Sequence, residues 1–274
     1  KNSELQLEPQ PKAWEQQVVG SFFGDKNCVK FLNWTLEYQL SIAGALNFLD
    51  SGSKKMNRSE KYRCLVKELY VLRCHLLPLE FDPTGDYAPE ILTRASMFRV
   101  LAHAEIESYI EERSWEIAVT AVNSWKGRRK TSRTLLGLLA FSDLKMEKPP
   151  NSLRPKKANS QSSWKNKLDI STKINQAMDI YHKAIENNHG IKEEHLLRLL
   201  LPIGFEANDL DPVWVADMSS FGEGRGKIVH TSASKWAKQQ LDPKNELKIV
   251  KSLLRNGVRF LDNKMEDLLL DTYL

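Results

Sequence analysis

The segment from Pro89 to Trp125 carries the longest uninterrupted helical pattern in the chain. Apolar side chains recur there at steps of three and four residues, which places them on one face of a helix with a period of 3.6 residues. Proline suits the first turn of a helix, so Pro89 marks the expected start. The residues expected on the buried face are Ile91, Ala95, Phe98, Leu101, Ala102, Ile106, Tyr109 and Ile110.

The same period predicts helices over most of the remaining chain, and no stretch alternates between apolar and polar residues as a half-buried strand would. We therefore predict an all-α helical bundle. The further helices are expected at about 26–49, 59–77, 132–141, 164–187, 192–201, 211–220, 226–236 and 243–273. The expected organisation is an extended or disordered lead-in at 1–20, an N-terminal helical hairpin packed on the bundle at 21–87, and the bundle itself at 88–274 with a basic flexible insert at about 145–163.

Composition excludes several classes of protein. No apolar run approaches the roughly 18 residues that a membrane helix needs, and the polar first residues do not resemble a secretory signal. Cys28, Cys64 and Cys74 match no zinc or redox spacing, so we predict reduced, mostly buried thiols. These features predict a cytoplasmic protein with no membrane association.

Positive charge is concentrated in one window of the sequence. Residues Lys126 to Lys167 include twelve Lys or Arg and two acids, a net charge of +10, whereas the rest of the chain carries −5. A basic segment on a mildly acidic body suggests a polyanionic partner, most commonly nucleic acid. The alternative is a solvated loop kept soluble by its charge. The residues predicted to bind RNA are Lys126, Arg128, Arg129, Lys130 and Arg133.

Histidines give no clear metal site. His103 and Glu107 are four residues apart and share one face of the long predicted helix. A zinc ion would need two more ligands from elsewhere, so a helix-face histidine is the simpler interpretation and we expect no metal and no cofactor.

The segment from Phe221 to Thr231 contains three glycines where a helix is expected to begin. Arg225 precedes His230 by five positions, which on a continuous helix would place the two about 140° apart. If Arg225 instead sits at the N-terminal edge of a helix, its side chain can turn back toward His230. Exposed first-turn amides and an arginine favour a phosphate, and a histidine can move a proton near neutral pH. This pair is a minimal set for cleaving RNA, whose 2′-hydroxyl provides the nucleophile.

The Arg-x4-His motif follows an earlier helical block, Arg94 to Glu112, with the sequence RASMFRVLAHAEIESYIEE. The two blocks in this order resemble the HEPN superfamily and, within it, the RiboL-PSP-HEPN family, over roughly Ala88 to Asp271. The resemblance implies a HEPN-like helical bundle and a metal-independent endoribonuclease. It also implies a homodimer that places two Arg/His sets around one RNA strand and leaves a 2′,3′-cyclic phosphate and a 5′-hydroxyl. Family members are toxins or antiviral defence effectors, so an antitoxin or defence-system partner is a further expectation.

The resemblance assigns Arg225 to the scissile phosphate and His230 to proton transfer. His103 and Glu107 would orient the motif or close the dimer, and Lys227 and Thr231 flank it as supporting residues. Gly226 stands where the family usually has Asn, and Thr231 stands where it has Gly. This departure favours an alternative, a non-catalytic HEPN module that binds RNA or a partner protein. A purely structural helical adaptor is a third interpretation.

Overall fold

The computed structural model describes residues 58–144, 169–230 and 241–273, and for Val229 and His230 the backbone alone. All described residues belong to one compact unit, Ser53–Leu274. The predicted lead-in at 1–20, the part of the hairpin before residue 58, the insert at 145–163 and Thr231 lie outside the described residues.

The described residues are helical and contain no strand, which confirms the all-α fold class. The helices are α3 (Glu60–Leu76), α4 (Pro89–Arg128), α5 (Arg133–Ala140), α7 (Ile170–Glu186), α8 (Glu193–Leu200), α9 (Pro212–His230), α11 (Pro243–Leu253) and α12 (Arg259–Tyr273). A 3₁₀ turn, η2 (Ala207–Asp209), precedes α9, and a π-helical turn, η3 (Leu254–Val258), joins α11 to α12.

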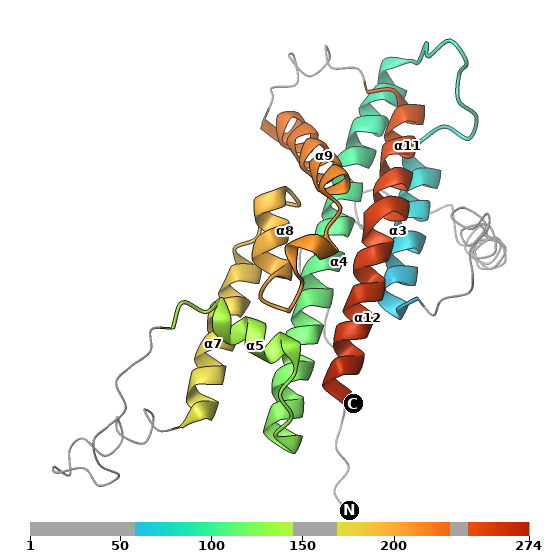
Figure 1. Cartoon of the computed structure of the whole chain (residues 1–274). Helices are drawn as coiled ribbons and strands as arrows, with labels where there is room; N and C mark the ends of the chain where they lie inside the picture. Colours follow the sequence, from blue (N-terminus) through green and yellow to red (C-terminus); the bar gives the residue numbers. More distant parts are fainter. Residues whose placement is uncertain (1–57, 145–168, 231–240, 274) are drawn as a thin grey trace, which may run out of the picture. The chain divides into compact units, whose positions relative to one another are not determined.

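Helix α4 is the centre of this unit, because α3, α5, α7, α8, α9, α11 and α12 all contact it (Figure 1). The predicted apolar face is the face that packs: Ala95, Phe98, Ala102 and Ile106 are completely buried. Leu101 is the exception, since 40% of its surface stays exposed. The alanines let neighbouring backbones approach closely, so one helix can serve as the common packing surface.

Helix α9 differs from the prediction. The sequence suggested two helices, 211–220 and 226–236, separated by a glycine-rich break, whereas Pro212–His230 is one continuous helix. A Cβ at position 224 would collide with the Arg99 guanidinium of α4, and a Cβ at 222 would lie 3.4 Å from the Lys192 side chain. Gly224 therefore permits the close packing of α9 on Arg99, which compensates for its low helix propensity, whereas a Cβ at 222 would make an ordinary contact.

Arg99 is held firmly where α9 packs against it. Its guanidinium donates to both carboxylate oxygens of Glu246 on α11, at 2.6 and 2.8 Å, and lies 5.3 Å from the centre of the Phe221 ring. A bidentate pair of this kind fixes the orientation of both partners. The last two turns of α9 are consequently positioned by a rigid contact with α4 and α11.

The π-helical turn η3 fits around a tryptophan. Gly257 lies against the Trp214 indole so closely that a Cβ would overlap it, and Trp214 Nε1 donates to the Leu253 carbonyl at 3.0 Å. This hydrogen bond joins the first turn of α9 to the C-terminal helices.

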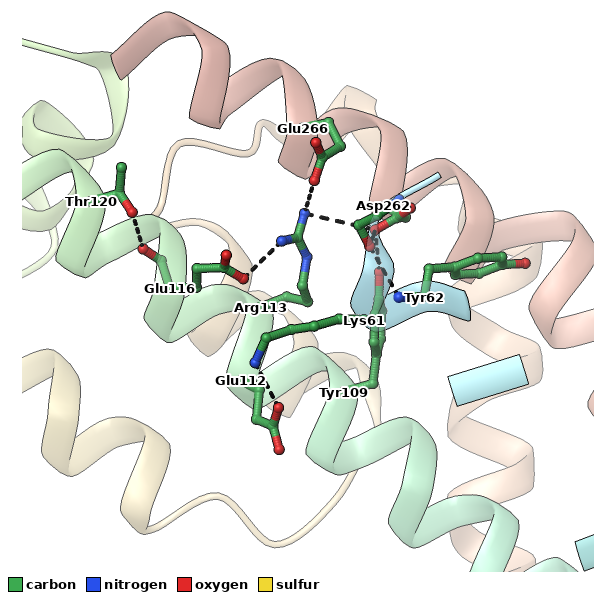
Figure 2. Close-up of polar contacts among 10 residues, drawn as sticks. Lys61, Tyr62, Tyr109, Glu112, Arg113, Glu116, Thr120, Asp262 and Glu266 are labelled. Atoms are coloured by element: carbon green, nitrogen blue, oxygen red, sulfur yellow. Dashed lines mark hydrogen bonds and ion pairs between the residues drawn. The ribbon is translucent and has the colours of Figure 1, made fainter. Parts of the chain in front are cut away.

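A buried polar cluster joins α3, α4 and α12 (Figure 2). We call Ser59, Tyr109, Arg113, Asp262 and Glu266 the Asp262 cluster. The Asp262 carboxylate accepts from the Ser59 amide at 3.0 Å, from the Ser59 hydroxyl and from the Tyr109 hydroxyl at 2.7 Å. The Arg113 guanidinium donates to Glu266 and lies 3.7 Å from Asp262. Burial and the Asp262 charge raise the pKa of Tyr109, so its hydroxyl stays a donor.

Two cysteines do not behave as predicted. Cys64 and Cys74 on α3 are free thiols, but both are exposed, so the expectation of mostly buried thiols is wrong for them. The buried face of α3 consists of Tyr62, Leu65, Val66 and Leu69 instead. Among the helices that the structure describes, none is long and apolar enough to cross a membrane.

Candidate functional site

A pocket of about 420 Å³ lies where α4, α9 and the connection between α7 and α8 meet. We call it the Arg225 pocket. Its cationic side chains, Arg225, Lys192 and Lys227, face one acidic side chain in the lining, that of Glu223. This volume is in the range of small-ligand sites, and the charge favours an anion. The lining residues are His103, His189, Gly190, Lys192, His195, Gly222, Glu223, Arg225, Gly226 and Lys227.

Arg225 contributes a buried nitrogen that lacks a hydrogen-bond acceptor. Its Nε is buried and has no hydrogen-bond partner among the described residues. Leaving such a donor unpaired costs about 1–3 kcal/mol, and more when the group is charged. An anionic oxygen that enters the pocket would satisfy this donor. The predicted role of Arg225 as a phosphate ligand thus has a physical basis in the packed fold.

His103 lines the same pocket from α4. Its side chain is 1% exposed and stacks on Phe221 of α9, with ring centres 6.2 Å apart and planes inclined by 25°. Nδ1 lies 3.4 Å from the Glu107 carboxylate, as the four-residue spacing predicts, but makes no hydrogen bond of good geometry. Nε2 lies beside Gly222, where a Cβ would be 3.6 Å away. The structure therefore brings His103 and Arg225 to one site.

Sequence reasoning missed the side of the pocket formed by residues 187–192 and the start of α8. His195 on this wall has two polar neighbours: its Nδ1 is 3.1 Å from Asn188 Oδ1 and 3.1 Å from Arg198 Nη2. Burial, with Arg198 second, lowers the pKa of His195, so the ring is neutral at neutral pH. The sequence offered one indication of this wall, the three histidines between residues 182 and 195, but their spacing matches no known type of site.

The continuous course of α9 changes the relation between Arg225 and His230. The expectation that Arg225 turns back from a helix edge is wrong, because both positions lie inside one helix. Their backbones are about 7.5 Å apart along the axis and about 140° apart around it. The amides near Arg225 are also internal to the helix, so they do not form the predicted phosphate-binding N-terminus. The His230 side chain lies outside the described part of the structure.

The predicted RNA-binding residues lie far from the pocket. Lys126 and Arg128 are exposed at the C-terminal end of α4, roughly 35 Å along the helix from His103. Arg129 lies 4.6 Å from the centre of the Trp125 ring, and Arg133 is ion-paired with Glu206 at 2.6 Å. Lys130 is half-buried beside them. These residues form a separate basic end of the bundle, and Arg133 is already engaged by an acid.

No three or more His, Cys, Asp or Glu side chains in the described ranges are arranged to hold a metal ion. Comparison of the chain with models of protein families, with curated proteins and with solved structures finds no match.

Proposed function

We propose that this protein is a metal-independent endoribonuclease of HEPN type. The observation that carries the proposal is the Arg225 pocket, in which a buried, unpaired arginine donor and an acid-paired histidine line one cationic cavity. The Arg-x4-His motif and the Arg94–Glu112 block resemble the HEPN superfamily, and this resemblance suggests that the substrate is RNA. The same resemblance makes the protein a toxin or antiviral effector, working in the cytoplasm with an antitoxin or a defence-system partner.

The reaction needs one phosphate ligand and two proton transfers. A base removes the proton from the RNA 2′-hydroxyl, the oxygen attacks the neighbouring phosphorus, and the bond from phosphorus to the 5′-oxygen breaks as that oxygen gains a proton. The products are a 2′,3′-cyclic phosphate and a 5′-hydroxyl. Arg225 holds the phosphate and offsets its growing negative charge, and His230 transfers one of the protons. His103, Glu107, Lys227 and Thr231 support the motif.

A homodimer fits the geometry of α9. Because positions 225 and 230 are on different sides of one helix, a second copy of the chain can bring its His230 toward Arg225 of the first. A two-fold axis would create two equivalent sites. The dimer should bury about 1,200 Å² or more in total. Light scattering that gives a strict monomer at tens of micromolar, with RNA present, contradicts it.

The same geometry favours one second candidate, a non-catalytic HEPN module that binds RNA or a partner protein. Within one protomer, the continuous helix separates Arg225 from His230, and Gly226 offers no polar side chain between them. Such a module would use the cationic pocket to bind a phosphate and would leave the RNA intact.

The test is cleavage of mixed RNA in EDTA, with analysis of the product ends. The wild type should release 2′,3′-cyclic phosphate ends from RNA and leave DNA of the same sequence intact, because DNA lacks the nucleophile. Arg225→Ala should lower cleavage by about 10²–10³-fold. Arg63→Ala, which removes an exposed arginine of α3, is the matched control and should not change it. A wild-type protein that binds RNA without cleaving it supports the module. If Arg225→Ala loses neither RNA cleavage nor RNA binding, both candidate functions are wrong.

A further inference from the structure

His103 has an environment that packing alone does not require. It is almost completely buried, yet Nδ1 has only the Glu107 carboxylate at 3.4 Å and makes no hydrogen bond. Buried polar atoms are nearly always bonded unless they serve a ligand or a reaction. On the same helix, Tyr109 is bonded to Asp262 at 2.7 Å and Arg113 Nε is unpaired, but of the three only His103 lines a pocket.

The orientation of the ring suits proton transfer into the pocket. Nδ1 faces Glu107, so Nε2 is on the opposite side of the ring, beside Gly222, and both residues line the Arg225 pocket. A carboxylate behind an imidazole holds the ring in place and balances the positive charge of its protonated form. Stacking on Phe221 and the rigid length of α4 fix the position further.

We propose that His103, backed by Glu107, is a second proton-transfer residue and delivers the proton to the leaving 5′-oxygen in the same protomer as Arg225. This role rests on the proposed ribonuclease function. His103 starts protonated at Nε2, the bond from phosphorus to the 5′-oxygen breaks, and that oxygen receives the proton as His103 becomes neutral. His230 takes the proton from the 2′-hydroxyl as that oxygen attacks the phosphorus, so the two histidines start in complementary protonation states.

Other charged groups face His103 besides Glu107. From α9 these are Arg225, Glu223 and Lys227, and from the opposite wall His189, Lys192 and His195. Glu107, with its carboxylate 3.4 Å from Nδ1, is the acid that backs the ring.

The discriminating experiment uses two RNA substrates. In one the scissile linkage is normal, and in the other the bridging 5′-oxygen is replaced by sulfur, which leaves without being protonated. His103→Gln should cut the normal substrate about 10²–10⁴-fold more slowly than the wild type. It should cut the sulfur substrate at nearly the wild-type rate. Equal losses on both substrates, or no loss on either, overturn the role of His103.

Glu107→Gln provides an independent measurement if His103→Gln does not fold. It should slow cleavage of the normal substrate by more than cleavage of the sulfur substrate, because the carboxylate that balances the protonated ring is lost. Wild-type rates of Glu107→Gln on the normal substrate count against the proposal. The control is Glu186→Gln, since Glu186 makes the same four-residue pairing with His182 on the exposed surface of α7.

The two proposals fail in different ways. If the wild type cuts neither substrate, the ribonuclease function itself is wrong. If the wild type cuts both and His103→Gln matches it while His230→Gln does not, the ribonuclease function holds and only the role of His103 is wrong.

Discussion

Two groups of polar side chains are buried along α4, the Asp262 cluster and the Arg225 pocket. In the Asp262 cluster, the carboxylate at the centre receives three hydrogen bonds, from the Ser59 amide, the Ser59 hydroxyl and the Tyr109 hydroxyl. In the Arg225 pocket, Arg225 Nε and His103 Nδ1 receive no hydrogen-bond partner from the described residues. Arg113 Nε of the Asp262 cluster is unpaired as well, but its two Nη atoms donate to Glu116 and Glu266.

From this difference we infer a structural role for the Asp262 cluster and a binding role for the Arg225 pocket. A carboxylate with all its donors in place stabilises and orients the helices that supply them. Unpaired donors beside an open pocket lower the stability of the free protein and gain a partner when a ligand binds. The same helix therefore carries one site that holds the bundle together and one site that is prepared for an anion.

The largest expected effect on stability is at the Asp262 cluster. Asp262→Ala removes the shared acceptor of the buried Ser59 and Tyr109 hydroxyls and the carboxylate 3.7 Å from Arg113, which keeps its bonds to Glu116 and Glu266. We expect the free energy of unfolding to fall by about 3–5 kcal/mol, measured by urea denaturation. RNA cleavage should fall only with the folded fraction. A comparable loss of stability in Arg225→Ala would remove the distinction between the two regions.

Two glycines of α9 allow a matched test of the packing around the pocket. Gly224→Ala forces a methyl group against Arg99, which Glu246 holds in place, and should destabilise the fold by about 1–3 kcal/mol. A methyl group on Gly226 would meet no atom of a neighbouring element within 4 Å, so Gly226→Ala should stabilise α9 by up to about 1 kcal/mol. Thermal unfolding of both variants decides this, and equal effects would contradict the described course of α9.

The basic end of α4 tests whether RNA extends beyond the pocket. Lys126→Glu combined with Arg128→Glu should reduce the salt dependence of RNA affinity by about 1.4 in logarithmic slope, at about 0.7 for each lost phosphate contact. The rate at saturating RNA should stay unchanged, because these residues lie far from Arg225. An unchanged slope indicates that the basic end is a solvated surface.

The smallest effect concerns the charge of His195. Burial and Arg198 lower its pKa below the unfolded value of about 6.5, so the stability that depends on the neutral ring is complete above pH 6.5 and is lost as the pH falls below it. Arg198→Gln should raise this pKa, observed by NMR of the imidazole carbon-bound protons. A lower or unchanged pKa would show that Arg198 does not influence the pocket.

The sequence predicted the parts of this molecule that depend on local periodicity. The long helix at Pro89, its buried stripe and the Glu107–His103 pairing all follow from three- and four-residue spacing. The glycines of α9 were misjudged, because a glycine that permits close packing has the same local signature as one that ends a helix. Lys192 and His195 could not be foreseen, since about 90 residues separate them from His103 and tertiary packing alone brings them together.

The central claim is that the Arg225 pocket is prepared for an RNA phosphate, and binding measured without cleavage tests it most directly. A short RNA with 2′-O-methyl groups lacks the nucleophile, so calorimetric titration reports affinity alone. Losing a charged hydrogen bond worth about 1.5–3 kcal/mol should weaken binding by about 10–100-fold in Arg225→Ala, with Arg63→Ala unchanged. Equal affinity of the wild type and Arg225→Ala would contradict the account.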